Sequence, residues 1–277
     1  MTNRWWIALV LLVGVLIGVS LTGWHVLPAK EVAARATCAD CHDLHGAIEW
    51  ADAPFQSQLW VLGDVPRSTY YLVNELFPYR NDTSGSKLTL TELLRRSGVE
   101  EFAQVALQSL DGGLVILDRP YVTDESVLLP YLEGVRFRDE NQHESTWLKG
   151  VRWVIVVGDE TPLTVDGTPT SLGRMMLRET AMLTETGSPA LFKSPLDNRL
   201  YRAIYTHTYP SAPLRGWLAQ PAATRLRITT AGGETIIWEA PAAAGAALLR
   251  LDDQLLLASS ALPRREWVRG VVAINSE

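Results

Sequence analysis

The chain contains an internal repeat with an offset of about 120 residues. The sequence LQSLDGGLVIL around Gly112-Gly113 aligns with RITTAGGETII around Gly232-Gly233. Further along, the run Trp147-Leu-Lys-Gly-Val151 aligns with Trp267-Val-Arg-Gly-Val271, and no gap separates the two matches. Ungapped agreement at this distance indicates two related domains in tandem.

The sequence of each copy predicts a β-hairpin, because a strand-like run is followed by a Gly-Gly turn and then by a second strand-like run. Each copy then closes with a β-rich run, Val151–Val157 in the first and Val271–Ile274 in the second. Before the first hairpin, Leu88–Gly98 has the pattern of a short amphipathic helix. Thr89 or Thr91 is near its N-cap, and Gly98 marks its end. The copies therefore predict an α+β layout.

The segment from Trp5 to Trp24 predicts a transmembrane anchor. It carries no charge, and about 20 helical residues span a hydrocarbon core of ~30 Å. Tryptophans lie at both ends and Arg4 precedes the segment, so the N-terminus is expected in the cytoplasm and the body in the periplasm. A cleaved signal peptide is the alternative, although its apolar region is usually shorter. We expect a single-pass protein of the inner (cytoplasmic) membrane.

The chain has two cysteines, and both lie in the sequence Cys38-Ala-Asp-Cys41-His42. This is the attachment signature of c-type haem. Two thiols on one helical turn can form thioethers to the haem vinyl groups, and the adjacent imidazole can bind the iron. A zinc site, a thioredoxin-like redox pair and a structural disulfide are the alternatives. The motif predicts one haem c, bound covalently by Cys38 and Cys41, with His42 as the axial iron ligand.

The sixth iron ligand is not evident from the sequence. His45 follows His42 by three residues, on the same side of the predicted helix, so it cannot easily reach the opposite face of the same haem. It could instead ligate a neighbouring haem of another subunit, or be solvated. The methionines lie in a run with helical periodicity, which favours core packing. The candidates for the sixth ligand or a neighbouring haem are His45, His207, Met175, Met176 and Met182.

Residues 30–50 resemble c-type cytochromes, and the run Cys-x-x-Cys-His-x-x-His-Gly resembles a motif of multihaem cytochromes. The common small soluble cytochromes usually supply a downstream methionine close to the haem. Here the only methionines after the first residue are the three candidates above, far along the chain. This departure argues against a self-contained haem domain, so the second axial ligand would come from a distant residue, a partner or water, or would be absent.

The order of TLTELL, DGG, LLPYLEGV and WLKGVRWVIVVG over residues 86–159 resembles the oxidoreductase molybdopterin-binding domain of the sulfite-oxidase family. Residues 206–275 resemble it more faintly. In that family a cysteine thiolate of this domain holds the molybdenum, but the present chain has no cysteine outside the haem motif. The resemblance therefore implies degenerate copies kept as a scaffold, and a molybdenum cofactor is not expected.

The net charge of −6 gives no reason to expect nucleic-acid binding, which needs a concentrated basic face. No phosphate loop or catalytic triad is evident. The sequence therefore predicts an electron carrier rather than a stand-alone enzyme. Its expected partners are the lipid bilayer and other redox subunits of a membrane complex. The alternatives are a structural or assembly subunit that uses the duplicated domains for docking, and a haem-based ligand sensor.

These interpretations define a predicted fold class and a domain order. The class is α+β: a transmembrane helix, a short haem-binding helical segment and two tandem β-rich domains related by duplication. The predicted order is a cytoplasmic tip (1–4), the anchor (5–24), the haem segment (25–52), the first repeat (53–160), a connector with a helix (161–205) and the second repeat (206–277).

Overall fold

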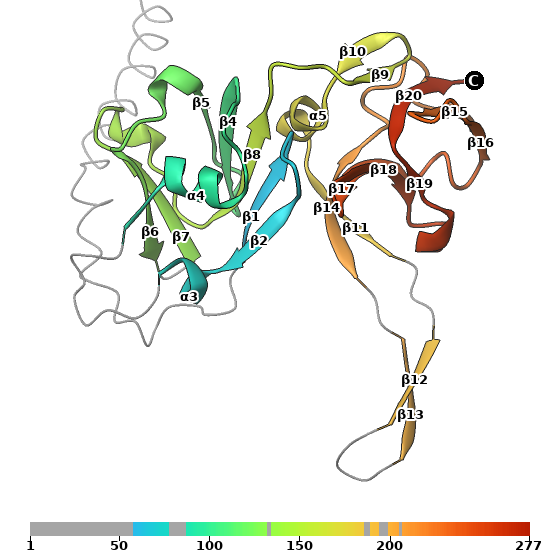
Figure 1. Ribbon diagram of the computed structural model, residues 1–277, viewed down its shortest axis with the longest axis horizontal. Helices are drawn as coiled ribbons and strands as arrows, with labels where there is room; N and C mark the ends of the chain where they lie inside the picture. Colours follow the sequence, from blue (N-terminus) through green and yellow to red (C-terminus); the bar gives the residue numbers. More distant parts are fainter. Residues whose placement is uncertain (1–57, 78–86, 132–133, 186–188, 194–198, 205–206) are drawn as a thin grey trace, which may run out of the picture. The chain divides into compact units, whose positions relative to one another are not determined.

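The computed structural model describes residues 58–277, except 78–86, 132–133, 186–188, 194–198 and 205–206 (Figure 1). The chain divides into two units, residues 1–48 and 49–277, and all described residues belong to the second. The predicted anchor at 5–24 and the predicted haem segment at 25–52 lie outside the described residues.

The described residues form mainly β-strands, so the predicted α+β class is wrong. Their α-helices are single short segments of four or seven residues, too short to build a helical layer. The reason is the pattern of apolar residues. Most of the described segments either alternate buried and exposed positions or are continuously apolar, and both patterns are typical of strands. The helices are α3 (Val73–Leu76), α4 (Leu90–Arg96) and α5 (Leu172–Arg178).

The predicted localisation also needs correction. Within the part of the chain that the structure describes, no helix is long and apolar enough to cross a bilayer. The structure therefore does not support a single-pass protein of the inner membrane.

The first repeat is built on a five-stranded sheet in the order β2-β1-β8-β4-β5. The neighbours β1 and β8 are parallel, and the other pairs are antiparallel. β4 and β5 form the hairpin predicted around Gly112-Gly113, which is confirmed. The strands are β1 (Gln58–Gly63), β2 (Thr69–Leu72), β4 (Gln104–Ser109), β5 (Leu114–Asp118) and β8 (Val151–Val157).

The second five-stranded sheet, β10-β9-β20-β15-β16, repeats this order strand for strand. Its parallel pair is β9 and β20, which correspond to β1 and β8. Two of its strands come from the segment predicted as a connector. The strands are β9 (Leu163–Val165), β10 (Thr168–Thr170), β15 (Arg225–Thr230), β16 (Thr235–Glu239) and β20 (Val271–Ser276).

The hairpin turns show where the sequence alignment slips by one residue. The positive φ falls on Gly112 (φ 89°) in the first turn and on Gly233 (φ 80°) in the second. Each of these glycines donates its N–H to the residue three positions earlier, Ser109 or Thr230. The hairpins therefore correspond at an offset of 121, and the chain after them at 120, because the second hairpin is followed by a connection one residue shorter.

Smaller sheets complete the two repeats. β3, β6 and β7 form one sheet, and β11, β14, β17, β18 and β19 form another. β12 and β13 pair with each other as a separate hairpin. The strands are β3 (Leu88–Thr89), β6 (Ser126–Tyr131), β7 (Gly134–Asp139), β11 (Ala181–Thr184), β12 (Pro189–Lys193), β13 (Leu200–Ile204), β14 (Thr208–Pro213), β17 (Ala246–Leu251), β18 (Gln254–Ser259) and β19 (Val268–Arg269).

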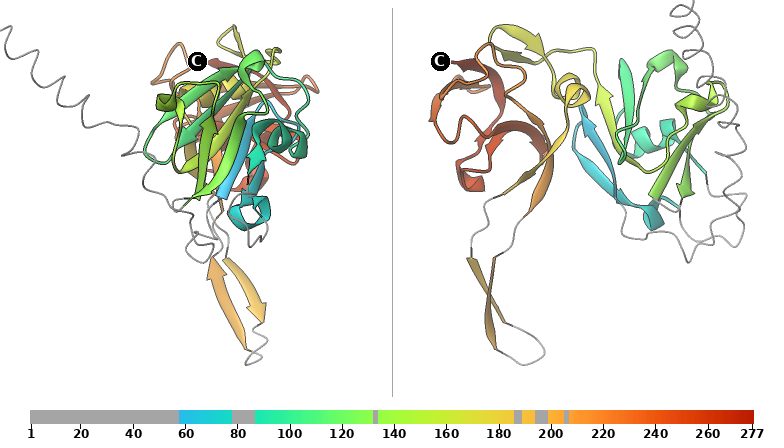
Figure 2. Two further views of the ribbon diagram at one scale, coloured as in Figure 1. Left: turned by 90° about the vertical axis from the view of Figure 1, so that its left-hand side faces the viewer. Right: turned by 180° about the vertical axis from the view of Figure 1, so that it is seen from behind.

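One apolar core joins the two repeats. Leu62, Ala106 and Ile155 lie on one face of the first sheet and pack into the core of the second repeat. Helix α5 contributes to this core and lies against β1, β8 and β14 (Figures 1 and 2). The opposite face of the first sheet packs on α4 and the sheet of β6 and β7 as a separate core. The repeats are therefore joined by packing as well as by the chain.

Two of the predicted helices lie within the described residues, and they turn out differently. α4 is confirmed: the Thr89 hydroxyl accepts from Glu92 N at 3.2 Å, and Gly98 has φ 74°. The helix predicted within the connector ends at Arg178, because the chain becomes extended at Glu179 (φ −157°, ψ 124°). Residues Ala181–Thr184 form β11 instead, paired with β14.

Candidate functional site

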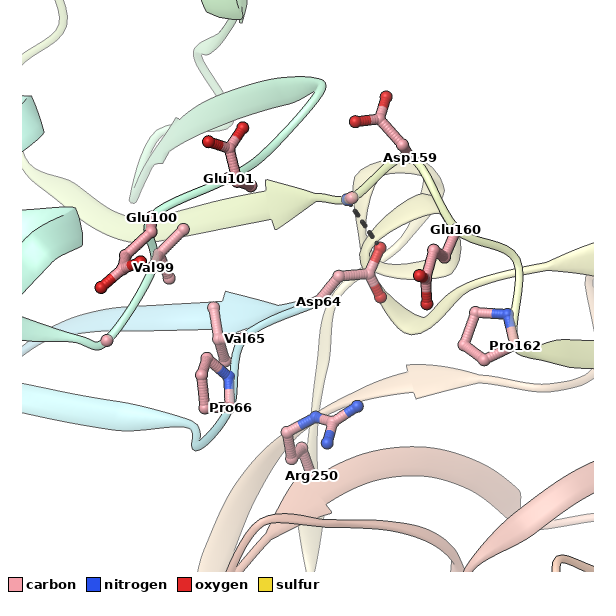
Figure 3. Close-up of a pocket in the computed structure, with 12 residues that line it drawn as sticks. Asp64, Val65, Pro66, Val99, Glu100, Glu101, Asp159, Glu160, Pro162 and Arg250 are labelled. Carbon is pink, nitrogen blue, oxygen red and sulfur yellow. Dashed lines mark hydrogen bonds between the residues drawn. The ribbon is translucent and has the colours of Figure 1, made fainter.

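A cleft of about 520 Å³ opens at the junction of the two repeats (Figure 3). The end of β1, the loop after α4 and the loop after β8 form one side. Arg250 on β17 reaches it from the second repeat. The lining residues are Asp64, Val65, Pro66, Gly98, Val99, Glu100, Glu101, Gly158, Asp159, Glu160, Pro162 and Arg250.

Asp64 is the best-fixed side chain of the cleft. β1 ends at Gly63, whose φ of 92° turns the chain so that Asp64 N donates to Val156 O at 2.9 Å. The Asp64 carboxylate accepts from Gly158 N at 3.0 Å, from the Ser171 hydroxyl at 2.5 Å and from Gly173 N at 2.9 Å. These bonds use most of the carboxylate's acceptor capacity, so Asp64 fastens the start of α5 to the first sheet.

Arg250 provides the positive charge of the cleft. Its side chain is partly buried, and its Nη1 donates to Asp253 O at 3.0 Å. Burial lowers the pKa of Arg250, while the charges of Asp64 and Asp253 act in the opposite direction. Its buried Nε has no hydrogen-bond partner. The Arg250 guanidinium is therefore held by the bond from Nη1 to Asp253 O, while its Nε donates to no acceptor.

The rim of the cleft is acidic. Glu100, Glu101, Asp159 and Glu160 are exposed, and of these Glu101 pairs with Arg119. Among the described residues, no group of three or more His, Cys, Asp or Glu is arranged to hold a metal ion. The cleft can therefore attract basic groups.

Four candidates for the sixth haem ligand lie within the described residues, and they occupy different surroundings. Met175 and Met176 on α5 are buried in the core that joins the repeats. Met182 on β11 is 37% exposed. His207 is exposed, with its ring centroid 6.4 Å from that of Tyr209. The predicted haem residues outside the described part are Cys38, Cys41, His42 and His45.

Sequence reasoning missed the roles of Asp64 and Arg250. A weak signal was present: Gly63-Asp64 directly follows an apolar strand, where turn residues are common. Nothing local links Asp64 to Ser171 or Gly173, which follow more than 100 residues later. These contacts exist only because α5 docks on β1 and β8.

Replacing Asp64 with alanine is expected to lower the free energy of unfolding by about 2–3 kcal/mol, because three donors lose their acceptor in a partly buried site. Urea unfolding followed by circular dichroism measures this change. The control is Asp159→Ala on the exposed rim, expected to change the same quantity by less than ~0.5 kcal/mol. Equal effects of the two substitutions would contradict the fastening role.

Comparison with known proteins gives little further information. No protein-family model matches the chain. No curated protein matches it either. The structure is weakly similar to the crystal structure of the sulfane dehydrogenase SoxCD from Paracoccus pantotrophus, with a TM-score of 0.31 and 11% sequence identity. The match covers 78% of this chain and 70% of that chain, and at this score it supports no conclusion about fold or function.

Proposed function

We propose that this chain is an electron-transfer protein that carries one covalent c-type haem and serves as a subunit or partner of a redox complex. The observation that carries the proposal is the sequence Cys38-x-x-Cys41-His42. It places two thiols and an imidazole at the spacing used for haem attachment, and the chain has no other cysteine that could complete a zinc site of four cysteines.

The donor set fits this cofactor. Cys38 and Cys41 would hold the haem by thioether bonds, and His42 would bind its iron. When bound, the haem supplies one-electron chemistry. For the second axial position, His207 and Met182 are accessible, whereas Met175 and Met176 are occupied in core packing. His45 and a partner's side chain are the other candidates.

A molybdenum cofactor does not fit this chain. We propose that the two repeats are degenerate copies of the molybdopterin-binding domain of the sulfite-oxidase family, on the sequence motifs that they share with it. The cysteine thiolate that holds molybdenum in that family has no counterpart here, since both cysteines lie in the haem motif. The repeats would then serve as a scaffold for docking, and the acidic rim of the cleft would suit a partner with a basic face.

The test is a pyridine haemochrome spectrum of the purified full-length protein. We expect a covalent c-type signal at one haem per chain, and its loss in the double variant Cys38→Ser, Cys41→Ser. The matched control is Met182→Leu, which should retain the covalent signal. A wild-type protein matured in a host that attaches c-type haem but lacking this signal would overturn the proposal.

A second candidate is a structural subunit that uses the repeats to brace an assembly. The observation in its favour is that the described residues form two five-stranded sheets of identical strand order. The haemochrome spectrum separates the two candidates. Carbon monoxide binding by the reduced protein would instead indicate the third possibility, a haem-based sensor with an open coordination position.

A further inference from the structure

Strand β5 is an apolar strand at the outer edge of the first sheet. Among the described residues it pairs only with β4. Its sequence, Leu-Val-Ile-Leu-Asp, has no charge or proline before Asp118. Leu114 and Ile116 are 44% and 46% exposed. Exposed edge strands are normally protected by charges, proline or bulges, so an edge of this kind favours pairing with another strand.

The second repeat provides an internal comparison. β16 occupies the same edge position in the second sheet, and Ile237 corresponds to Ile116 at the offset of 121. β16 is itself uncharged before Glu239, but the neighbouring strand β15 places charges on the same face: Arg225 pairs with Glu239 at 3.4 Å, and Arg227 pairs with Glu277 at 2.5 Å. The fold therefore does not require an apolar face at this edge: Ile116 lies beside Ala106, whereas Ile237 lies beside Arg227.

The exposed Ile116 of β5 continues an apolar row across the first sheet. The strand register places Ile116 beside Ala106, followed by Ile155 and Leu62, all three fully buried. A residue that extends a buried row but is itself half exposed gains most from a neighbour on its open side. An added strand would supply that neighbour.

We infer that β5 pairs with β5 of a second copy of this chain, antiparallel about a two-fold axis through Ile116. Antiparallel edges are self-complementary under such an axis, which makes the interface isologous. The register then sets Ile116 against its own copy, Val115 against Leu117 of the second copy and Leu114 against Asp118 of the second copy. The two five-stranded sheets would become one continuous sheet.

The charges that flank β5 agree with this register. Asp111 lies in the turn before β5, and Arg119 directly follows the strand. Because the start of one β5 lies beside the end of the other in an antiparallel pair, Asp111 of each copy would lie near the end that carries Arg119 of the second copy. Asp111 is held by hydrogen bonds from the Ser109 hydroxyl and from Gly113 N, and its carboxylate remains exposed to a partner. Opposite charges would thus lie near each other at both ends of the apolar segment by symmetry, with Arg119 also paired to Glu101 of its own chain.

Sedimentation equilibrium of the full-length protein tests the inference. We expect a dimer for the wild type and at least roughly 100-fold weaker association for Ile116→Lys, because the two-fold axis would bring two buried lysines together. Ile237→Lys is the matched control and should remain dimeric. A monomeric wild type, or a dimer equally resistant to both substitutions, would overturn the inference. Circular dichroism of each variant verifies that it is folded.

Cysteine cross-linking tests the axis itself. Residues that face each other across an antiparallel pair have Cα atoms about 4.5–5.5 Å apart, within reach of a disulfide. In a background with Cys38→Ser and Cys41→Ser, Ile116→Cys should form a covalent dimer under mild oxidation, and Ile237→Cys should not. Equal cross-linking by both variants would contradict the register. Because this background carries no covalent haem, its result is independent of the proposed electron transfer.

Discussion

Replacing Gly173 with alanine is expected to lower the free energy of unfolding by about 3 kcal/mol, although alanine is the better helix former by about 1 kcal/mol. A Cβ at this position in the first turn of α5 would lie 2.1 Å from Val156 O and 2.7 Å from Asp64 Oδ2. Contacts this short do not occur in folded proteins, so the helix or the sheet would have to move. Helix propensity favours alanine at this position, whereas steric overlap disfavours it. We expect the overlap to have the larger effect on the free energy of unfolding.

The atoms that the new methyl group would meet cannot easily give way. Val156 O belongs to the central strand β8 and also accepts from Asp64 N. Asp64 Oδ1 accepts from Gly173 N itself at 2.9 Å. Any shift of α5 away from β8 would therefore weaken this bond and open the core that joins the repeats.

Urea unfolding of the full-length protein measures the change. Gly216→Ala is the matched control, because Gly216 is exposed and its added Cβ would meet only Arg178 Cζ at 3.9 Å. We expect this control to change the free energy of unfolding by less than ~0.5 kcal/mol. A Gly173→Ala protein as stable as wild type would show that α5 does not dock as closely as described.

The sequence was sufficient for structure that depends on neighbours in the chain. The β4–β5 hairpin follows from apolar runs around a glycine turn, and α4 follows from the Thr89 cap and the Gly98 stop. The helix predicted within the connector formed only as far as Arg178, because local periodicity could not anticipate the pairing of the following residues with β14. Pairing with β14 supplies hydrogen bonds that make Ala181–Thr184 a strand.

The candidate site was less predictable than the fold, because its contacts connect distant segments. Asp64, Gly158 and Ser171 meet only after β1 has paired in parallel with β8 and α5 has packed on both. Arg250 comes from the other repeat. By contrast, the haem motif is a local signal, since three residues within five positions carry the whole prediction.

Replacing Trp267 with alanine is expected to lower the free energy of unfolding by about 3–5 kcal/mol, as for other buried tryptophans. Trp267 is 5% exposed and belongs to the small core on the outer face of β17 and β18. Its Nε1 donates to Ser259 O at 3.2 Å, and its ring packs edge-on against Tyr209 with centroids 5.7 Å apart. The substitution removes these contacts and leaves a cavity.

Trp147, at the same position in the first repeat, is the internal control. We expect Trp147→Ala to lower the free energy of unfolding by less than Trp267→Ala does. It keeps the equivalent hydrogen bond, from its Nε1 to Asp139 O at 2.9 Å. Its ring, however, is partly exposed and lies beneath Arg136 and Arg138, whose Cζ atoms are 5.7 and 4.8 Å from the ring centroid. Two cations cover this ring where apolar residues cover the other.

The comparison of the two tryptophans separates what the duplication preserves from what it changes. The indole hydrogen bond to Asp139 O or Ser259 O is common to both repeats, so the contribution of that bond cancels in the difference between Trp267→Ala and Trp147→Ala. Trp267 Nε1 also lies 3.3 Å from a second acceptor, Leu262 O, and this contact adds to the difference. What remains is the difference between burial in an apolar core and stacking under guanidinium groups, which we expect to be about 1–2 kcal/mol. Urea unfolding of both variants measures it. Equal losses would mean that the shared hydrogen bond, and not the covering residues, determines the contribution of this tryptophan.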